Sequence, residues 1–592
     1  SYWDAGEFIA VSYKLMVPHP PGAPFYLLIG RIFSLLSFGD GEQVGYWINI
    51  ASVLSSGFTI LFLFWTISML ARKMLGLKPG DEITLANKIT ILGASAVGAL
   101  VYTFSDSFWF SAVEAEVYAM SSFFTALVVW AMLKWDLIED ESRANRWLIL
   151  IAYMMGLSIG VHLLNLVTIP ALGFIYYFKK YTPSTKGIIW TLAISGFIVI
   201  LINNMIIPGL PSIAGYFEIF FINNIGLPFG SGAIIFALLV ISSLVWGIRW
   251  SLQHEKPLLN TALLSLAFIL IGYSSYSIIV IRSNYDPPID ENNPENAITF
   301  VKYLKREQYG SRPLFYGKYF TADVLRDEMG RAITEDGEAV YVKGENEYEM
   351  VDRKVEYKYD PNHSTILPRM YSEAPQHIRK YRQVTGLRPN EKPSFGDNLG
   401  FMFKHQLGWM YFRYFMWNFA GRESDIQDAG WLTPLEAMED VPAELATNKG
   451  RNNYFMIPLI LGIVGLVFQF KTDVKGFAFV ALLFFLTGIA LILYLNSPPI
   501  EPRERDYIYV GSFYAFAIWV GFSVLPIAAA LKKAFSAKPA AIAATVLCLV
   551  APAIMAQQNW NDHDRSNRYF SVDSAKNFLS STADGAILFT GG

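Results

Sequence analysis

Charged residues are scarce in this sequence, at 16% of 592 residues, against about 25% in soluble globular proteins. Hydrophobic residues make up 53%, which excludes an ordinary soluble globule and indicates a membrane protein. The 47 basic and 50 acidic residues give a net charge of -3, and no basic tract is interleaved with aromatics, so nucleic acid is not an expected partner. The single cysteine, Cys548, can form neither an intrachain disulfide nor a thiolate metal cluster.

Several catalytic motifs are also missing. The sequence has no glycine-rich phosphate loop of either common spacing, no paired-histidine metalloprotease motif and no nucleophile elbow. Nucleotide-driven chemistry on the cytoplasmic side is therefore not expected. Because the sequence opens at Ser1 inside a polar motif and stops at Gly592, we expect the native chain to continue at both ends.

Long apolar runs predict a polytopic α-helical membrane protein. A helix of about 20 apolar residues spans a bilayer, and this criterion predicts about 12 spans. They cover 45–71, 88–104, 117–135, 147–160, 163–178, 187–207, 230–250, 258–281, 453–470, 477–495, 508–531 and 539–556. Lys and Arg collect in loops that one threading places on the cytoplasmic side. In that threading residues 147–178 enter the membrane and return to the same side, turning near 160–165. Residues 20–38 lie along the outer face as an interfacial helix.

The same threading predicts four regions. They are an N-terminal transmembrane module (1–281), an inserted extracytoplasmic α/β soluble domain (282–452), C-terminal transmembrane helices (453–556) and the start of an extracytoplasmic C-terminal region (557–592). Within the second region the sequence predicts a capped helix over 297–309, short strands over 337–360 and an aromatic helix at the membrane surface over 404–420.

Polar residues gather on the predicted outer face, first around Trp3-Asp4-Ala5-Gly6-Glu7-Phe8 and His19. Asp4 and Glu7 are three residues apart, so on a helical turn both carboxylates face one way, where one can act as a base. A solvated acidic loop is the plain alternative. Acidic residues among Trp, Phe and Ile at a bilayer edge are costly, however, which favours a functional role.

Two further clusters flank the predicted spans. Glu114 and Glu116 precede the span at 117, next to Tyr118, and their spacing lets at most one of them face a given site. Helix capping explains them equally well. His162 and Asn165 lie at the predicted hairpin turn, where a hydrogen-bonded core histidine is the more common outcome.

The fourth cluster is the proline-stiffened loop Pro498-Pro499-Ile500-Glu501-Pro502-Arg503-Glu504-Arg505-Asp506-Tyr507. Arg503 and Arg505 can hold a phosphate through bidentate forks. Alternatively they pair with neighbouring acids or with lipid headgroups. The polar segment 560–566 fits either a metal site or a solvated linker.

These motifs together resemble a bacterial family of polytopic proteins that looks like a branch of the GT-C glycosyltransferases and is similar to protein O-mannosyltransferases. The residues that carry the resemblance are Trp3-Asp4-x-Gly6-Glu7-Phe8-Ile9, His19-Pro20-Pro21-Gly22-Ala23-Pro24, Glu114-Ala115-Glu116-Val117-Tyr118 and Pro502-Arg503-Glu504-Arg505-Asp506-Tyr507. The resemblance implies a GT-C-like bundle in the bacterial inner membrane, with its site on the periplasmic side. It also implies that a first transmembrane helix precedes the acidic motif.

The resemblance further implies a polyprenyl-phosphate sugar donor and a protein or glycan acceptor hydroxyl. Asp4 matches the family's catalytic carboxylate, with Glu7 beside it, and Glu116 matches better than Glu114. We expect Asp4 to accept the proton of a Ser or Thr hydroxyl during an inverting displacement, while Arg503 and Arg505 stabilise the leaving phosphate. His19, Tyr118, His162, Asn165 and Asp506 are further candidates for donor or acceptor binding. A divalent metal among the carboxylates is possible, but their spacing does not predict one.

Two other classes of function fit the pattern. A transporter or flippase of a lipid-linked or anionic substrate would use the acids and arginines for binding, but it would carry charges midway along its spans. Such charges are scarce here, which favours an enzyme. An envelope assembly component without enzymatic activity is the third possibility.

Overall fold

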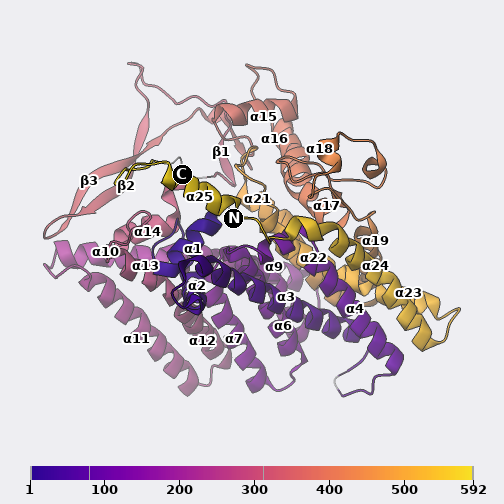
Figure 1. Ribbon diagram of the computed structural model, residues 1–592. Helices are drawn as coiled ribbons and strands as arrows, with labels where there is room; N and C mark the ends of the chain where they lie inside the picture. Colours follow the sequence, from indigo (N-terminus) through magenta and orange to yellow (C-terminus); the bar gives the residue numbers. More distant parts are fainter. Residues whose placement is uncertain (1–2, 79, 311, 590–592) are drawn as a thin grey trace.

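The computed structural model describes residues 3–78, 80–310 and 312–589 (Figure 1). In these residues nine helices are long and apolar enough to cross a membrane. They are Gly41–Met74, Leu85–Thr103, Val117–Leu137, Thr185–Asn223, Ser231–Gln253, Pro257–Ser283, Val474–Leu495, Asp506–Leu531 and Ala537–His563. The protein is therefore a polytopic helical membrane protein, as predicted.

Nine of the about 12 predicted spans correspond to the nine helices, and the other three fall in helices that are shorter or more polar. The segment at 453–470 is the 16-residue helix α19 (Ile457–Thr472). The segments at 147–160 and 163–178 are the two arms of one hairpin, α7 (Glu141–Ile159) and α8 (Ile169–Lys180), joined by the short helix η3 (Leu163–Thr168).

The hairpin turns where the sequence predicts it, and its two ends meet. Lys180 at the end of α8 pairs with Glu141 at the start of α7. Lys179 donates hydrogen bonds to the carbonyls of Trp135 (2.5 Å) and Ile138 (2.7 Å), at the end of α6 (Val117–Leu137). Several of the predicted basic loops thus lie at one end of the bundle. Glu116 lies at the opposite end of α6, about 30 Å away for a helix of this length.

Helix α22 (Val510–Phe522) forms the centre of the bundle. It is apolar on all sides, which is typical of a helix enclosed by others, and 12 of its 13 residues are buried. It packs against α4 (Leu85–Thr103), α19 and α20 (Val474–Phe485). Glycines permit the closest approach: a Cβ on Gly521 would lie 2.5 Å from the carbonyl oxygen of Ala94. Small residues at such contacts are common between membrane helices.

Other long helices surround this centre. They are α3 (Val44–Met74), α9 (Thr185–Ile200) with η4 (Leu201–Gly209) and α10 (Leu210–Asn223), α11 (Ser231–Gln253), α12 (Pro257–Tyr273), α13 (Ser277–Ser283), α21 (Leu491–Leu495), α23 (Val524–Leu531) and α24 (Ala537–His563). At the end of the bundle opposite the basic loops lie α1 (Asp4–Lys14), α2 (Pro24–Ser34) and α5 (Asp106–Ala112). Helix α2 lies within the predicted interfacial segment 20–38.

Residues 282–452 form the sheet-containing region. Asn296 caps α14 (Ala297–Lys305) with a capping box, as predicted. The predicted strands form the antiparallel hairpin of β2 (Thr334–Lys343) and β3 (Tyr348–Tyr357), which projects from the bundle in Figure 1. The other elements are β1 (Tyr316–Lys318), β4 (Ser364–Ile366), α15 (Pro375–Thr385), α16 (Phe395–Phe401), η8 (Met402–Phe412), α17 (Arg413–Phe419), α18 (Ala443–Ala446), β5 (Gly421–Arg422) and β6 (Asn452–Asn453).

The aromatic helix predicted at 404–420 is present, as η8 and α17, but its position was wrong. Trp417 and Phe419 are fully buried. The rings of Phe415 and Phe419 lie 4.8 and 4.6 Å from the ring of Phe516 in α22, so this helix packs into the bundle core. Burial of its aromatic side chains there replaces the predicted contact with the membrane surface.

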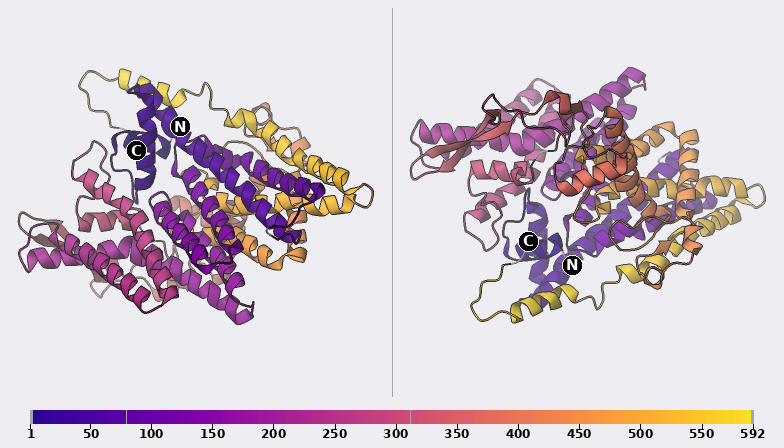
Figure 2. Two further views of the ribbon diagram at one scale, coloured as in Figure 1. Left: turned by 90° about the horizontal axis from the view of Figure 1, so that it is seen from below. Right: turned by 90° about the horizontal axis from the view of Figure 1, so that it is seen from above.

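The C-terminal part also differs from expectation. The span predicted at 539–556 continues as α24 to His563, whose side chain is buried against Asp106 of α5. Segment 560–566 is therefore partly a packed helix end. The following helix, α25 (Phe570–Ser580), returns beside α1 in all the views of Figures 1 and 2.

Candidate active site

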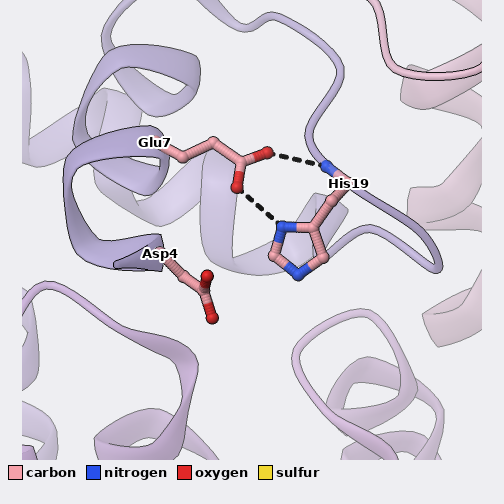
Figure 3. A group of neighbouring side chains, drawn as sticks. All are labelled: Asp4, Glu7 and His19. Carbon is pink, nitrogen blue, oxygen red and sulfur yellow. Dashed lines mark hydrogen bonds and ion pairs between the residues drawn. The ribbon is translucent and has the colours of Figure 1, made fainter. Parts of the chain in front are cut away.

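Helix α1 and the loop after it position the first group of polar side chains. Asp4 and Glu7 lie one turn apart at the start of α1. Glu7 accepts two hydrogen bonds from His19, one from the backbone N–H (2.7 Å) and one from Nδ1 (2.6 Å) (Figure 3). Burial opposes ionisation of Glu7, but the hydrogen bonds and charge of His19 outweigh it and lower the Glu7 pKa. Burial likewise opposes the charged form of His19, yet Glu7 raises the pKa of this ring.

Asp4 faces a different partner. Arg503 Nη2 donates to Asp4 Oδ2 at 2.7 Å, and Arg503 Nη1 donates to Glu116 Oε1 at 3.4 Å. The guanidinium also lies over the ring of Tyr507, 5.0 Å from its centroid. One arginine thus joins the motif at 3–9, the motif at 114–118 and the motif at 502–507. The chain brings these residues together although Asp4 and Arg503 are 499 positions apart.

Glu116 is the most deeply buried carboxylate of this group. It occupies the N-cap position of α6, yet its side chain makes no capping hydrogen bond there, and only 5% of the side chain is exposed. Burial raises the pKa of Glu116 to about 7, and the charges of Glu114 and Asp4 add to the rise while Arg503 limits it. Glu114 faces Arg565 instead (3.7 Å). The two glutamates therefore face different partners, as their spacing predicts.

Aromatic side chains separate these charges from the interior of the bundle. The ring of Tyr118 lies 4.4 Å from Tyr507 and 5.2 Å from His162. Burial lowers the pKa of His162 to about 4, so the ring is neutral at physiological pH. Beneath Tyr118 is a narrow cavity of about 20 Å³, which we call the bundle cavity. Its lining is mostly apolar and hydroxyl-bearing: Tyr102, Tyr118, Ser121, Ser122, Thr125, Leu164, Val167, Thr487, Leu491, Ile508, Val510, Gly511 and Tyr514.

Two of the residues singled out in the sequence have other partners. Asn165 is fully buried and donates to Ser158 Oγ (3.1 Å), while its Oδ1 accepts from Thr125 (3.3 Å), so it holds the hairpin turn together. Asp506 hydrogen-bonds Ser107 and lies near Arg422 and Asp106. The structure therefore does not bring Asn165 or Asp506 to the Asp4 carboxylate.

Arg505 and its neighbours line the other side of the loop. Arg505 Nη2 pairs with Glu501 Oε2 at 2.9 Å. Glu504 accepts from both Nη atoms of Arg413 (3.2 and 2.7 Å) and from the hydroxyl of Tyr414 (2.5 Å). Arg413 and Tyr414 were missed in the sequence, where they read only as part of an aromatic helix. In the sequence, one feature could have indicated such partners. Acids and arginines alternate in 501–506, so each of these charged side chains needs a partner of its own.

A second cavity, of about 120 Å³, lies between η8, α17 and the loop at 499–504, and we call it the outer cavity. Arg503 lines it as well, so this cavity adjoins the Asp4 carboxylate. Its other lining residues are Lys380, His405, Trp409, Met410, Arg413, Tyr414, Gln427, Asp428, Pro499, Ile500, Glu501 and Glu504. Unlike the bundle cavity, it is lined largely by polar and aromatic side chains.

Asp4, Glu7 and His19 are also a possible set of metal ligands, because one ligand atom from each lies within 4.8 Å of the others. Carboxylate and imidazole ligands suit several divalent cations. Glu7 and His19 already bind each other, however, and Arg503 supplies the positive charge at Asp4. The contacts therefore satisfy these side chains without requiring a cation.

Comparison with known families bears on this arrangement. Residues 4–185 match the family model described as the protein O-mannosyl-transferase TMEM260 N-terminal domain. The N-terminal region is related to protein O-mannosyl-transferases. This finding confirms the resemblance carried by the motifs at 3–9, 19–24 and 114–118. Residues 310–403 match a family of unknown function, DUF8416.

Two curated relatives carry the same family name. Protein O-mannosyl-transferase tmem260 of Dictyostelium discoideum is 23% identical over 196 residues, which is 32% of this chain and 22% of the relative. Protein O-mannosyl-transferase TMEM260 of Mus musculus is 28% identical over 157 residues, 26% of this chain and 19% of the relative. The chain thus spans about a fifth of the length of these relatives. No solved structure matches.

Proposed function

We propose that the protein is a membrane glycosyltransferase of the GT-C class, which transfers a sugar from a polyprenyl-phosphate donor to the hydroxyl of a protein Ser or Thr. The relatives' name supports sugar transfer to protein. The observation that carries the proposal is that Arg503 holds Asp4 and Glu116 together at one end of the bundle, opposite the basic loops. Under the threading above, this end faces the periplasm of a bacterial inner membrane.

Asp4 is the base in this mechanism. Of the two carboxylates on Arg503, its side chain is the more exposed, at 37% against 5% for Glu116, so it is the one that an incoming hydroxyl can reach. The hydrogen bond from Arg503 occupies Oδ2 and leaves Oδ1 to accept a proton. The acceptor oxygen forms a bond to the anomeric carbon as the bond from that carbon to the phosphate oxygen breaks. A single displacement inverts the anomeric centre.

The leaving group is a lipid phosphate, which departs as an anion and needs no general acid. Positive charge beside it therefore lowers the barrier, as in other phosphate-leaving reactions. Arg505 adjoins Arg503 and supplies such charge. This arrangement differs from glycoside hydrolysis, in which two carboxylates flank the scissile bond.

The two cavities fit the two substrates. The lining of the narrow bundle cavity is mostly apolar and belongs largely to the long apolar helices, so the first isoprene units of the donor would lie against this lining. The outer cavity is polar and faces the sheet-containing region, so it suits the acceptor segment. The oxygen Oε1 of Glu501, which lines the outer cavity, is buried without a hydrogen-bond partner in the described residues and can accept from an N–H or O–H of the acceptor.

The test supplies the full-length protein in detergent with a Ser/Thr peptide and either a polyprenyl-phosphate hexose or a nucleotide hexose. We expect the labelled sugar to reach the peptide only from the lipid donor, with inverted stereochemistry. Transfer from the nucleotide sugar alone, or retained stereochemistry, contradicts this mechanism. Movement of the lipid between the leaflets of proteoliposomes that hold the same protein, without any sugar transfer, would support a flippase instead.

A further inference from the structure

The arginines of the 502–507 motif are already neutralised by carboxylates. Arg503 binds Asp4 and Glu116, and Arg505 binds Glu501. An anionic phosphate placed against these two side chains would meet three carboxylates as well. A phosphate bound beside Arg505 is therefore stabilised most by further cations that carry no internal counter-ion, and these come from another part of the chain.

Arg306, at the end of α14, is such a cation. Its guanidinium lies 4.7 Å from the centroid of the Tyr309 ring. Among the described residues no carboxylate lies within ion-pair distance of it, and the groups with the largest electrostatic influence on it are Tyr309, Tyr118, Arg312 and Arg505. Arg306 also has a positive φ of 55°, a conformation that is uncommon for a residue with a side chain and is found more often at ligand sites.

The placement of Arg306 is fixed by its own helix. One turn earlier, the hydroxyl of Tyr303 donates to the carbonyl of Pro18 at 2.6 Å, and the Tyr303 ring packs against Gly22. Helix α14 is thereby anchored to the loop that carries His19. Arg306 follows directly at the C-cap of this helix and comes from a region that neither family match includes.

A second cation of the same kind lies on the same connection. Arg312 Nη1 donates to the carbonyl of Leu495 (3.2 Å) and to Ser497 Oγ (3.2 Å), both neutral groups. Arg306 therefore lies next to the helix that contacts the His19 loop, and Arg312 contacts the segment that enters the 502–507 motif.

Electrostatic effects place Arg306 near both sides of the site. Burial and then the positive charge of Arg306 lower the pKa of His162. For Arg306 itself, burial and the charges of Arg312 and Arg505 lower the pKa. Its charge also acts on Tyr118, which covers the bundle cavity. The three arginines thus lie close enough for the charges of Arg312 and Arg505 to act on Arg306.

We propose that Arg306, together with Arg312 and Arg505, binds a phosphate group above the Tyr118 side chain. The assignment of this group to the lipid-linked donor rests on the proposed function. A lipid whose first isoprene units lie against the apolar lining of the bundle cavity would place its phosphate at this position. The sheet-containing region would then complete the donor site, while Arg503 remains the positioning residue for Asp4.

The test measures equilibrium binding to the full-length protein in detergent, with polyprenyl phosphate, polyprenol and inorganic phosphate as separate probes. The variants are Arg306→Ala and Arg306→Lys, with Arg326→Ala as a matched control from an exposed turn, where Arg326 contacts the carbonyl of Gly330. Loss of one charged hydrogen-bonding group predicts polyprenyl phosphate binding about 10- to 100-fold weaker in Arg306→Ala. Arg306→Lys keeps the positive charge but loses the paired N–H donors of the guanidinium, so its affinity should lie between those of the wild type and Arg306→Ala.

Polyprenol binding should not change in any variant, and Arg326→Ala should behave as the wild type. Unchanged polyprenyl phosphate binding in Arg306→Ala, or an equal loss for polyprenol, overturns the inference. Loss of inorganic phosphate binding alone would keep a phosphate site but assign it to free phosphate, which overturns the assignment to the lipid.

These probes carry no sugar, so binding does not depend on turnover. Arg306-dependent binding in a protein that transfers no sugar would support the phosphate site and refute the proposed function. Sugar transfer from a donor whose binding does not depend on Arg306 would support the proposed function and refute the phosphate site.

Discussion

Replacing Glu116 with glutamine should stabilise the protein at pH 8 and leave its stability unchanged at pH 4. The folded protein buries this carboxyl and raises its pKa from 4.5 to about 7. Below pH 4.5 the side chain is protonated in both the folded and the unfolded chain, so its burial does not lower the free energy of unfolding through a charge. As the pH rises toward 7 the unfolded chain releases the proton first, and the folded state loses stability relative to it. Above pH 7 the free energy of unfolding is lowered by the full cost of burying the ionised carboxylate.

The pKa values give the size of the effect. A rise from 4.5 to about 7 corresponds to about 3 kcal/mol of free energy of unfolding above pH 7. Glutamine has nearly the shape of the protonated glutamic acid, and its amide oxygen can still accept from Arg503 Nη1. The variant therefore removes the buried charge and retains the hydrogen bond.

The assay is reversible or kinetic unfolding of the purified protein in one detergent, followed at pH 8 and pH 4. Glu139→Gln serves as the control, because Glu139 is exposed between α6 and α7, and it should change stability little at either pH. A Glu116→Gln protein that is less stable than the wild type at pH 8 would refute the reasoning. That result would mean that attraction to Arg503 exceeds the cost of burying the charge.

Three other changes have defined outcomes. In Arg503→Lys the new side chain can reach only one of the two carboxylates, Asp4 or Glu116, so we expect kcat to fall about 10- to 100-fold in a sugar transfer assay. Wild-type activity would show that simultaneous binding of both carboxylates is unnecessary. Glu7→Gln and His19→Ala should each lower the free energy of unfolding by about 1 to 2 kcal/mol, with the double variant no worse than either; full additivity would contradict their pairing. Gly465→Ala places a Cβ 1.8 Å from the Trp519 carbonyl oxygen and should cost about 1 to 3 kcal/mol in thermal unfolding, whereas Gly57→Ala, with open space around it, should not.

Local features of the fold could be predicted from the sequence because they depend on neighbouring residues. The capping residue Asn296 starts α14, and the alternating residues after 337 form the β2–β3 hairpin. The turn between α7 and α8 followed from the positions of the basic loops. Nine of the about 12 predicted spans are single helices of sufficient length and hydropathy, whereas α19 is shorter and α7 and α8 are the arms of a hairpin.

Contacts between distant segments could be predicted only in part. The resemblance and the threading put Asp4, Glu116 and Arg503 on one face, and the structure joins them. Asp506 follows Arg505 directly yet has its partners in another cluster, because the chain turns into η11 (Asp506–Tyr509) at this point. No spacing rule predicts that difference.

Residues whose partners lie in the sheet-containing region could not be found from the sequence. Arg413 forms an ion pair with Glu504 across 91 positions, and in the sequence it is one charge in an aromatic helix. In the sequence Arg306 does not stand out either, because it is one of several basic residues near the end of a predicted helix. Its setting depends on the anchoring of Tyr303 to Pro18, which only the three-dimensional structure reveals.

The central claim is that Asp4 is the base of a sugar transfer from lipid phosphate to a hydroxyl. The most direct measurement compares the turnover of polyprenyl-phosphate hexose and a Ser/Thr peptide by full-length wild-type protein and by Asp4→Asn. Asp40→Asn is the control, since Asp40 is an exposed residue of the same outer loop. Asparagine can still accept the hydrogen bond from Arg503 but cannot take a proton, so kcat should fall about 100-fold or more while Asp40→Asn stays active. Turnover by Asp4→Asn at the wild-type rate, or none by the wild type, would contradict the account.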